Sequence, residues 1–178
     1  MSIDALCASL PDYAKDLSLN LSNLASETVL TEQQKWGAFL AAAYAVGTPQ
    51  VVRAINDAAR QAGLSDEAAA AAKAAAAVMG MNNVYYRSLH LLSNAEYRTL
   101  PAKLRMNVLA DPGVPKIDFE LWSAAVSAVN GCGMCLDAHE TELRRSKAPT
   151  TAIQAALRIA AVVKAVSGVV AAEAAAVA

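Results

Sequence analysis

Aromatic residues are scarce in this sequence of 178 residues, and so are cysteines and any excess of charge. Aromatic side chains make up 5% of the chain, with only two phenylalanines. A core with so few large rings has to pack through small side chains, which suits closely spaced helices. Alanine supplies much of the 56% hydrophobic content. Because alanine is the best helix former and a poor strand former, the composition predicts an all-α fold.

The charge balance offers nothing that would attract nucleic acid. The formal net charge is −1 and the isoelectric point is near 6.1. The nearest approach to a basic cluster is Arg144, Arg145 and Lys147, and Glu140 and Glu142 lie beside it. Mixed charges at this spacing are typical of a solvated helix face. We therefore expect no nucleic-acid partner.

We also expect no segment that directs the chain to or across a membrane. Met1-Ser2-Ile3-Asp4 has neither a basic start nor an apolar run, so we expect no signal peptide. The most apolar stretches are interrupted by Lys73, Lys164 and Glu173, so we expect no membrane span. The sequence therefore predicts a soluble, cytoplasmic protein. In that compartment its three cysteines should stay reduced unless their chemistry is redox.

No linker or charge block divides the chain, which is interpreted as one helical domain over residues 1–178. Thr31 with Gln34 forms a capping-box pattern before a helix from about Gln33 to Val46, which Gly47 ends. Later boundaries follow the same logic. Thr48-Pro49, Ser65 and Pro149 are predicted to start helices, and residues 111–115 are predicted to form a loop. A further helix is expected from about Asp118 to Val129, ended by Asn130-Gly131.

These boundary signals recur in two halves, about 31–90 and 118–172. Each half has a tryptophan helix, a break, a polar helix and an alanine-rich helix. Trp36 and Trp122 are 86 residues apart, and Lys73 and Arg158 are 85 apart. The pattern predicts a degenerate internal repeat. Only the second half carries cysteines at its break, so we expect the chemistry there.

Cys132 and Cys135 enclose Gly133-Met134 directly after the Asn130-Gly131 helix stop. The pair is therefore predicted at the N-terminus of the next helix, where exposed N–H groups and the helix dipole favour a thiolate. A separation of three residues brings both sulfurs to one helix face. The two residues should close and reopen a disulfide with little backbone movement.

His139 follows Cys135 by four residues, on the same helical stripe. An imidazole at this spacing can accept a thiol proton, directly or through water. Glu120, in the preceding helix, is a candidate acid that could hydrogen-bond the imidazole and keep it basic. Helix-end arguments favour Cys132 as the more acidic thiol, whereas the nearby histidine favours Cys135. We assign the attacking role to Cys135 because a dedicated base is local and specific.

Other interpretations of these residues lead to different classes of protein. Cys132, Cys135 and His139 are three legitimate zinc ligands, so a non-catalytic zinc-binding or redox-sensing module is an alternative. A structural zinc site would need a fourth ligand, and no second C-x-x-C is present, so no metal is predicted. Haem attachment is excluded because Leu136, not histidine, follows Cys135.

The remaining candidates are interpreted as structural. Cys7 is expected to act as a small hydrophobe, and His90 as a packed or surface residue. Trp36 and Trp122 are expected to anchor the core. The segment from Met79 to Tyr86 is more polar and aromatic than a plain core helix needs. Helix packing is the preferred interpretation of that segment, with a wall of the active site as the alternative.

Several of these motifs together resemble the alkyl hydroperoxidase D (AhpD) family. The resemblance covers nearly the whole chain and is most specific from Pro112 to Glu140. It is carried by Met106-Asn107, Asp111-Pro112-Gly113-Val114-Pro115-Lys116, Phe119-Glu120-Leu121-Trp122-Ser123, Ala128-Val129-Asn130-Gly131-Cys132, Cys135-Leu136 and Ala138-His139-Glu140, with Met79 to Arg87 and Pro11-Asp12-Tyr13-Ala14-Lys15-Asp16.

The resemblance implies an all-helical fold shared with carboxymuconolactone decarboxylase-like proteins, commonly a homotrimer. It implies a thiol peroxidase that reduces alkyl hydroperoxides and passes electrons to an AhpC-type peroxiredoxin. No tightly bound cofactor is implied. Electrons would come from NADH through dihydrolipoamide dehydrogenase and the lipoyl group of a dihydrolipoyl succinyltransferase. A decarboxylase-type enzyme on the same fold is a further alternative.

The resemblance also implies roles for individual residues. Glu120 and His139 would relay a proton from Cys135, which attacks the peroxide and becomes a sulfenic acid. Cys132 would supply a proton and then resolve the intermediate as a disulfide. Met134 departs from the pattern, because well-known members carry a histidine there. We therefore expect reduced or retuned activity, not its absence.

Overall fold

The computed structural model describes residues 2–176, and within them the fold is all-α. This confirms the predicted fold class. The α-helices are α1 Ile3–Ala8, α2 Lys15–Ser26, α3 Glu32–Val46, α4 Pro49–Gln61, α5 Asp66–Leu91, α6 Lys116–Asn130, α7 Gly133–Arg145 and α8 Thr150–Ala176. Three short 3₁₀ helices accompany them, at Asp12–Ala14, Ala95–Thr99 and Asn107–Leu109.

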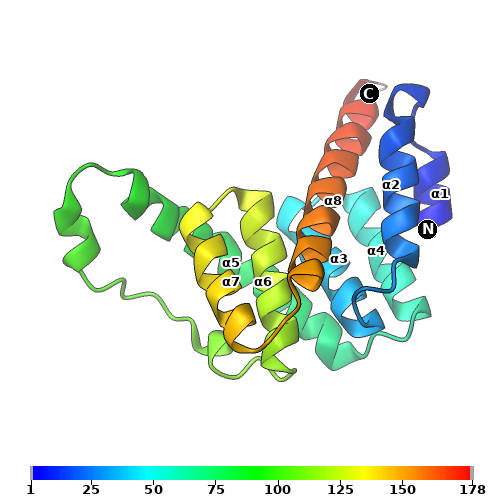
Figure 1. Cartoon of the computed structure of the whole chain (residues 1–178). Helices are drawn as coiled ribbons and strands as arrows, with labels where there is room; N and C mark the ends of the chain where they lie inside the picture. Colours follow the sequence, from blue (N-terminus) through cyan, green and yellow to red (C-terminus); the bar gives the residue numbers. More distant parts are fainter. Residues whose placement is uncertain (1, 177–178) are drawn as a thin grey trace.

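Figure 1 shows how these helices are arranged. Helix α2 lies beside α8 with α1 on its other side, and α5, α6 and α7 group together towards the opposite side of the molecule. The chain between α5 and α6 projects away from the helical body as an arm, residues 92–115, before it returns to start α6. The returning part of this arm leads directly to the helices that hold the cysteine pair.

The predicted helix boundaries are largely observed. Thr31 and Gln34 form both hydrogen bonds of the capping box, and Gly47 ends α3 with a left-handed φ of 83°. Ser65 accepts from the Ala68 N–H and caps α5. Thr48 differs from expectation, because its hydroxyl does not cap α4 but donates to the Ser167 carbonyl of α8 at 3.3 Å. This side chain therefore ties two helices together.

Helix α6 begins two residues earlier than predicted, at Lys116, with Pro115 at its N-cap. Asp118 is consequently inside the first turn, where it faces α3. It accepts hydrogen bonds from the amides of Gln33 at 2.7 Å and Gln34 at 2.8 Å. A carboxylate near a helix N-terminus is also favoured by the helix dipole. Asp118 thus joins α6 to α3 and also stabilises the first turn of α6.

The centre of the fold is the contact between α3 and α6. A Cβ placed on Gly37 would lie 2.1 Å from the indole of Trp122, so only glycine allows the two helices to approach this closely. The Trp122 indole N–H donates to the Gln34 carbonyl at 3.1 Å. Trp36 and Trp122 are both buried, as expected of core anchors. This contact holds α6 rigidly at the position from which the cysteine loop starts.

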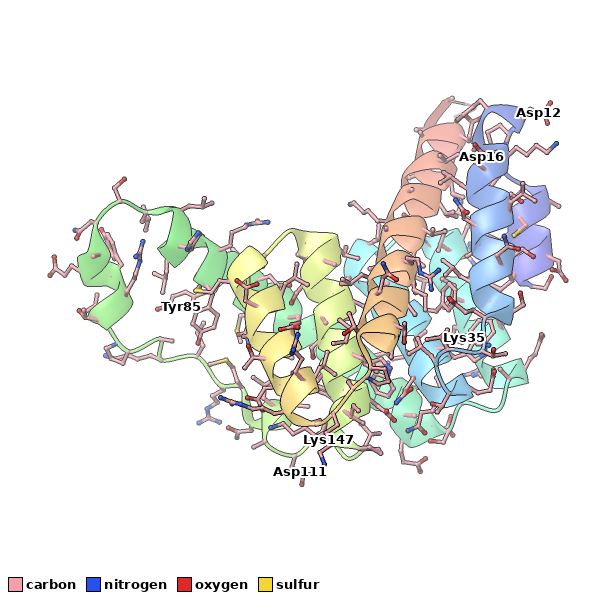
Figure 2. The ribbon with its side chains drawn as sticks, viewed as in Figure 1. Asp12, Asp16, Lys35, Tyr85, Asp111 and Lys147 are labelled. Carbon is pink, nitrogen blue, oxygen red and sulfur yellow. A yellow bond between two sulfur atoms is a disulfide. The ribbon has the colours of Figure 1, made fainter. Side chains whose placement is uncertain are left out.

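Buried charge near the core is compensated locally. Lys35, labelled in Figure 2, is buried and donates to the Glu27 carbonyl at 3.2 Å and to Glu32 at 2.9 Å. That hydrogen bond from Lys35 holds the pKa of Glu32 below its ordinary value. These two acceptors provide the hydrogen bonds that a buried ammonium group needs.

Within residues 2–176, α8 alone has the length and hydropathy of a membrane-spanning helix. These two properties do not distinguish such a helix from a core helix of a soluble protein. α8 packs against α2, α3 and α6 along its length, and its apolar residues Ile159, Val163 and Val166 are buried there. This packing buries 39% of the most apolar stretch of α8, and residues 171–176 are exposed.

Candidate active site

The cysteine pair lies at the junction between α6 and α7. Gly131 ends α6 in the left-handed region, with φ 67°. The Gly131 N–H donates to the Ala128 carbonyl, and the Cys132 N–H to the Ser127 carbonyl. These are the two hydrogen bonds of a Schellman motif. Cys132 follows as the N-cap of α7, in extended backbone, and Cys135 lies in the first turn. The predicted position at a helix N-terminus is confirmed.

Cys132 and Cys135 are joined in a disulfide, with their Cα atoms 5.3 Å apart. The predicted pairing is therefore formed. The two sulfurs differ in access, because Cys132 is 0% exposed whereas Cys135 is 8% exposed and lines a pocket. A reagent arriving from the pocket therefore meets Cys135, and Cys132 lies behind it.

His139 and Glu120 meet across the gap between α7 and α6. His139 Nδ1 lies 2.7 Å from Glu120 Oε2, and the two side chains are 12% and 13% exposed. The carboxylate can only accept, so Nδ1 carries the hydrogen and Nε2 is left to exchange a proton. The contact that sequence alone left open is thus present in the structure.

The second ring nitrogen of His139 contacts a methionine from α5. His139 Nε2 lies 3.2 Å from the Met79 sulfur. A thioether can only accept, so an unprotonated Nε2 packs against this sulfur and donates to it only once it carries a proton. The ring therefore has one strong partner, Glu120, and one weak one, and its free nitrogen stays available as a base.

A pocket of about 350 Å³ opens beside the disulfide, a volume in the range of small-molecule sites. Its walls come from α5, from the returning arm and from α7. They are mostly apolar, with Asn82, His139 and the Tyr86 phenol as the polar exceptions. The lining residues are Met79, Asn82, Tyr86, Met106, Leu109, Met134, Cys135, Ala138 and His139.

This pocket decides between the two interpretations of the segment from Met79 to Tyr86. Helix packing was preferred from sequence, but Met79, Asn82 and Tyr86 form one wall of the active-site pocket. The preferred interpretation was therefore incomplete. The signal that could have revealed the wall is the spacing of these three residues, which places them on one face of α5.

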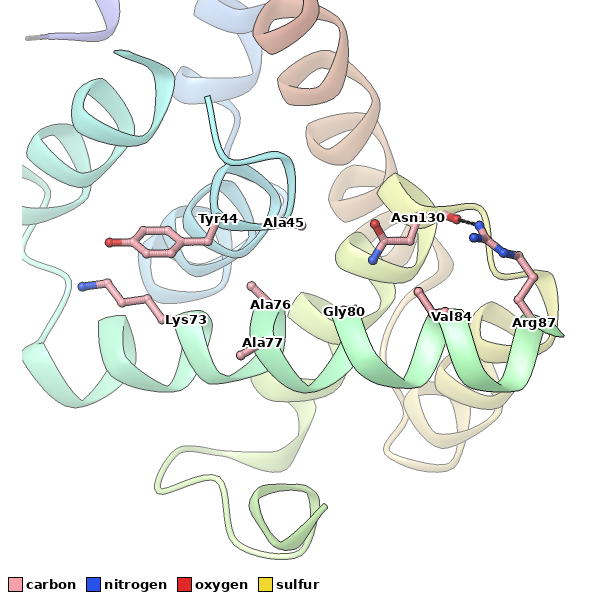
Figure 3. A pocket seen from close by; sticks show the side chains of 9 residues that line it. All are labelled: Tyr44, Ala45, Lys73, Ala76, Ala77, Gly80, Val84, Arg87 and Asn130. Carbon is pink, nitrogen blue, oxygen red and sulfur yellow. Dashed lines mark hydrogen bonds between the residues drawn. The ribbon is translucent and has the colours of Figure 1, made fainter. Parts of the chain in front are cut away.

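A polar network from α5 holds the end of α6 in place. The Asn83 amide donates to Ser127 Oγ at 2.9 Å and accepts from the Asn130 amide at 2.9 Å. Arg87 donates to the Asn130 carbonyl, as Figure 3 shows. A cation at the last carbonyls of a helix satisfies an unpaired acceptor and complements the dipole. These contacts hold the backbone at Asn130, two residues before Cys132.

A second hollow of about 400 Å³ runs along α5 from Lys73 to Arg87 (Figure 3). Lys73 lies over the Tyr44 ring, with its Nζ 5.3 Å from the ring centroid. Gly80 and Val84 line the same hollow. No cysteine, histidine or acid lines it, and its lysine and tyrosine contact each other.

The remaining candidates lie apart from this site. Cys7 is a partly buried free thiol on α1 that contacts Ser18 of α2. His90 is exposed in the last turn of α5. Within residues 2–176, no three histidine, cysteine or acidic side chains are arranged to hold a metal ion.

Comparison with known proteins connects this geometry with a family. Residues 95–178 match the carboxymuconolactone decarboxylase family. The chain is 65% identical over 173 residues to the alkyl hydroperoxide reductase AhpD of Maricaulis maris, covering 97% of this chain and 99% of that one. It is 62% identical over 175 residues to the protein of that name from Hyphomonas neptunium, covering 98% and 97%.

The same name belongs to a Brucella abortus protein that is 57% identical over 165 residues, covering 92% of this chain and 93% of that one. These likenesses extend over nearly the full length of the chain and of its relatives. The chain therefore belongs to the AhpD family of alkyl hydroperoxide reductases, which are oxidoreductases.

Proposed function

We propose that the protein reduces alkyl hydroperoxides in the bacterial cytoplasm by cycling Cys135 and Cys132 between thiols and a disulfide. One observation carries this proposal. The disulfide pair lies beside the Glu120–His139 pair, and Cys135 and His139 line the same apolar pocket. A nucleophile, a base, a group that orients the base and a site for an apolar substrate are thus together.

The cycle begins with proton transfer from the Cys135 thiol to His139 Nε2. Glu120 accepts the hydrogen of Nδ1 and stabilises the imidazolium that forms. The N-terminus of α7 adds a second stabilisation, since Cys135 lies in its first turn and the dipole there favours a thiolate. Thiolate is the reactive form, so both effects raise the rate of attack.

The Cys135 thiolate then attacks the terminal oxygen of the hydroperoxide. A sulfur–oxygen bond forms as the oxygen–oxygen bond breaks, and the alkyl oxygen leaves as an alcohol with a proton from the Cys132 thiol. Sulfur is oxidised to a sulfenic acid and the peroxide is reduced. The Cys132 thiolate next attacks the Cys135 sulfur, and the hydroxide released takes the proton from His139 and leaves as water. The disulfide remains.

Re-reduction needs two electrons from outside the chain. In our proposal they come from NADH through dihydrolipoamide dehydrogenase and the lipoyl group of a dihydrolipoyl succinyltransferase, so the chain itself needs no bound cofactor. A dihydrolipoyl thiolate would attack Cys135, the sulfur with access from the pocket. Cys132 then departs as the leaving thiolate, and a second attack within the lipoyl group releases the protein.

The reduced pair would also serve an AhpC-type peroxiredoxin, whose disulfide would be attacked by the same Cys135 sulfur. We propose this transfer as a second outlet for the same electrons, in a homotrimer of the chain. Direct peroxide reduction and delivery to the peroxiredoxin share every step up to the thiolate, so both depend on the same four side chains, Glu120, Cys132, Cys135 and His139.

The test is peroxide-dependent NADH oxidation with the purified protein, dihydrolipoamide dehydrogenase, lipoamide and cumene hydroperoxide. We expect turnover that requires all components, and faster NADH oxidation when an AhpC-type peroxiredoxin is added. If neither peroxide nor peroxiredoxin draws electrons from the fully reduced protein, the proposal is wrong. Free thiols counted before and after one equivalent of peroxide report whether the pair is the group oxidised.

A further inference from the structure

The thiol cycle assigns no role to Asn82, a polar side chain of the active-site pocket. Asn82 lies on α5, three residues after Met79 and four before Tyr86, and all three line the pocket. These spacings place them on one face of the helix. α5 therefore presents a single carboxamide to the space that Cys135 and His139 share.

That carboxamide is buried without a partner. Asn82 is 4% exposed, and its Oδ1 is one of three buried side-chain polar atoms in residues 2–176 that make no hydrogen bond. Leaving a buried acceptor unpaired costs stability, and folds seldom tolerate it without a reason. The adjacent Asn83 shows the ordinary case, since its amide is fully buried and both donates and accepts within the protein.

The surroundings of Asn82 restrict what its partner can be. Apart from Tyr86, His139 and Cys135, the pocket walls around it are thioethers and aliphatic groups, contributed by Met79, Met106, Leu109, Met134 and Ala138. A ligand that fits has an apolar body and one group able to donate a hydrogen bond to Oδ1. An alkyl hydroperoxide has this combination, because its terminal O–H donates and its alkyl group is apolar.

We infer that Asn82 binds the hydroperoxide group of the substrate, with Oδ1 accepting the hydrogen bond of the terminal O–H and the alkyl group against the methionines. This inference rests on the proposed peroxide reduction. The hydrogen bond holds the terminal oxygen, the atom that the Cys135 sulfur attacks, on the wall facing Cys135. Asn82 thus selects and orients the substrate, while Cys135, Cys132 and His139 move the electrons and protons.

The test is a single-turnover measurement on the whole protein, reduced with dithiothreitol and then freed of it. Cumene hydroperoxide is mixed with the wild type, Asn82→Leu and Ser167→Ala, and disulfide formation is followed by thiol titration at several peroxide concentrations. Leucine approximates the shape of asparagine but cannot accept a hydrogen bond. Ser167 is the matched control, because its Oγ is also buried and unpaired but lies on α8, outside the pocket.

We expect Asn82→Leu to lower the second-order rate constant about tenfold, the effect of one lost hydrogen bond to substrate. Its melting temperature should not fall, because an unpaired buried acceptor has been removed. Ser167→Ala should react like the wild type. If Asn82→Leu matches the wild-type rate, the inference is wrong. A wild type that fails to react with peroxide refutes the proposed function instead.

A second variant covers the case in which leucine disturbs the fold. If Asn82→Leu melts below the wild type, Asn82→Ala takes its place, because the smaller side chain introduces no clash. A rate for Asn82→Ala within about twofold of the wild type, less than one hydrogen bond contributes, then overturns the inference. A loss of about tenfold with an unchanged melting temperature supports it.

Discussion

The α3–α4 and α6–α7 junctions use the same backbone device for different ends. Each helix stops at a left-handed glycine, Gly47 with φ 83° and Gly131 with φ 67°, and a new helix starts within two residues. At the first junction Thr48 and Pro49 follow, and the Thr48 hydroxyl is tied to α8. At the second junction Cys132 follows, and a pocket lies beside it.

The turn itself therefore carries no chemistry. Pro49 removes the N–H at the first helical position of α4, and the first turn, residues 49–52, holds no cysteine or acid. Gly133 keeps that N–H in α7, so the helix N-terminus can stabilise a thiolate. What separates the two junctions is therefore a few side chains, together with the partners that α5 and α6 bring to one of them.

The largest effect is expected when a sulfur of the Cys132–Cys135 pair is removed. Cys135→Ser should abolish peroxide-driven NADH oxidation, a loss of at least about 10³-fold, because a serine hydroxyl is not ionised by an imidazole at neutral pH. Cys132→Ser should still form one equivalent of sulfenic acid, detectable by a dimedone adduct in mass spectrometry, but should not complete the cycle.

The matched variant at the other junction is Thr48→Val. It removes the hydroxyl that donates to Ser167, so it should cost about 1 kcal/mol of unfolding free energy and leave turnover intact. If Cys135→Ser and Cys132→Ser leave the turnover of the enzyme unchanged, a decarboxylase-type reaction on this fold is favoured instead.

Removal of the base should produce the next largest effect. His139→Gln leaves Cys135 without a proton acceptor, so peroxide consumption at pH 7 should fall roughly 100-fold. The thiolate then forms only at higher pH, so the rate–pH profile should move towards alkaline pH. Stopped-flow rates from pH 5 to pH 9 measure both effects. An unchanged rate and profile would remove His139 from the mechanism.

Sequence reasoning succeeded where the cause is local. The capping box at Thr31, the left-handed stop at Gly47 and the placement of Cys132 at a helix start all depend on neighbours within a few residues. The i, i+4 relation of Cys135 and His139 is equally local. Such features follow from the backbone geometry of one turn, so one sequence is enough to predict them.

Sequence reasoning stopped where partners come from distant segments. Asp118 was expected near a helix start, but its bonds to Gln33 and Gln34 cross more than eighty residues. The wall formed by Met79 and Asn82 reaches His139 only because α5 packs against α6 and α7. Helical periodicity identifies a buried face but does not say which other face it meets.

A finer test of the comparison replaces each left-handed glycine in turn. Gly47→Ala and Gly131→Ala both force a β-carbon into a positive φ, so each should lose about 1 kcal/mol of unfolding free energy in urea titrations. Only Gly131→Ala should also slow peroxide reduction, because it alone moves the backbone that leads to Cys132. Equal activities in the two variants would show that the α6 end tolerates movement without consequence for the thiols.

The smallest effect is expected at Cys7, the cysteine outside both junctions. Burial raises the pKa of its thiol, so less thiolate is present near neutral pH than on an exposed cysteine and alkylation should be slow. In the reduced protein, iodoacetamide followed by mass spectrometry should label Cys135 before Cys7. Cys7→Ala should keep peroxide turnover within about twofold of wild type, as expected of a substitution away from the reacting groups. If Cys7 is labelled faster than Cys135 and Cys7→Ala loses peroxide turnover, a third thiol takes part in the electron transfer.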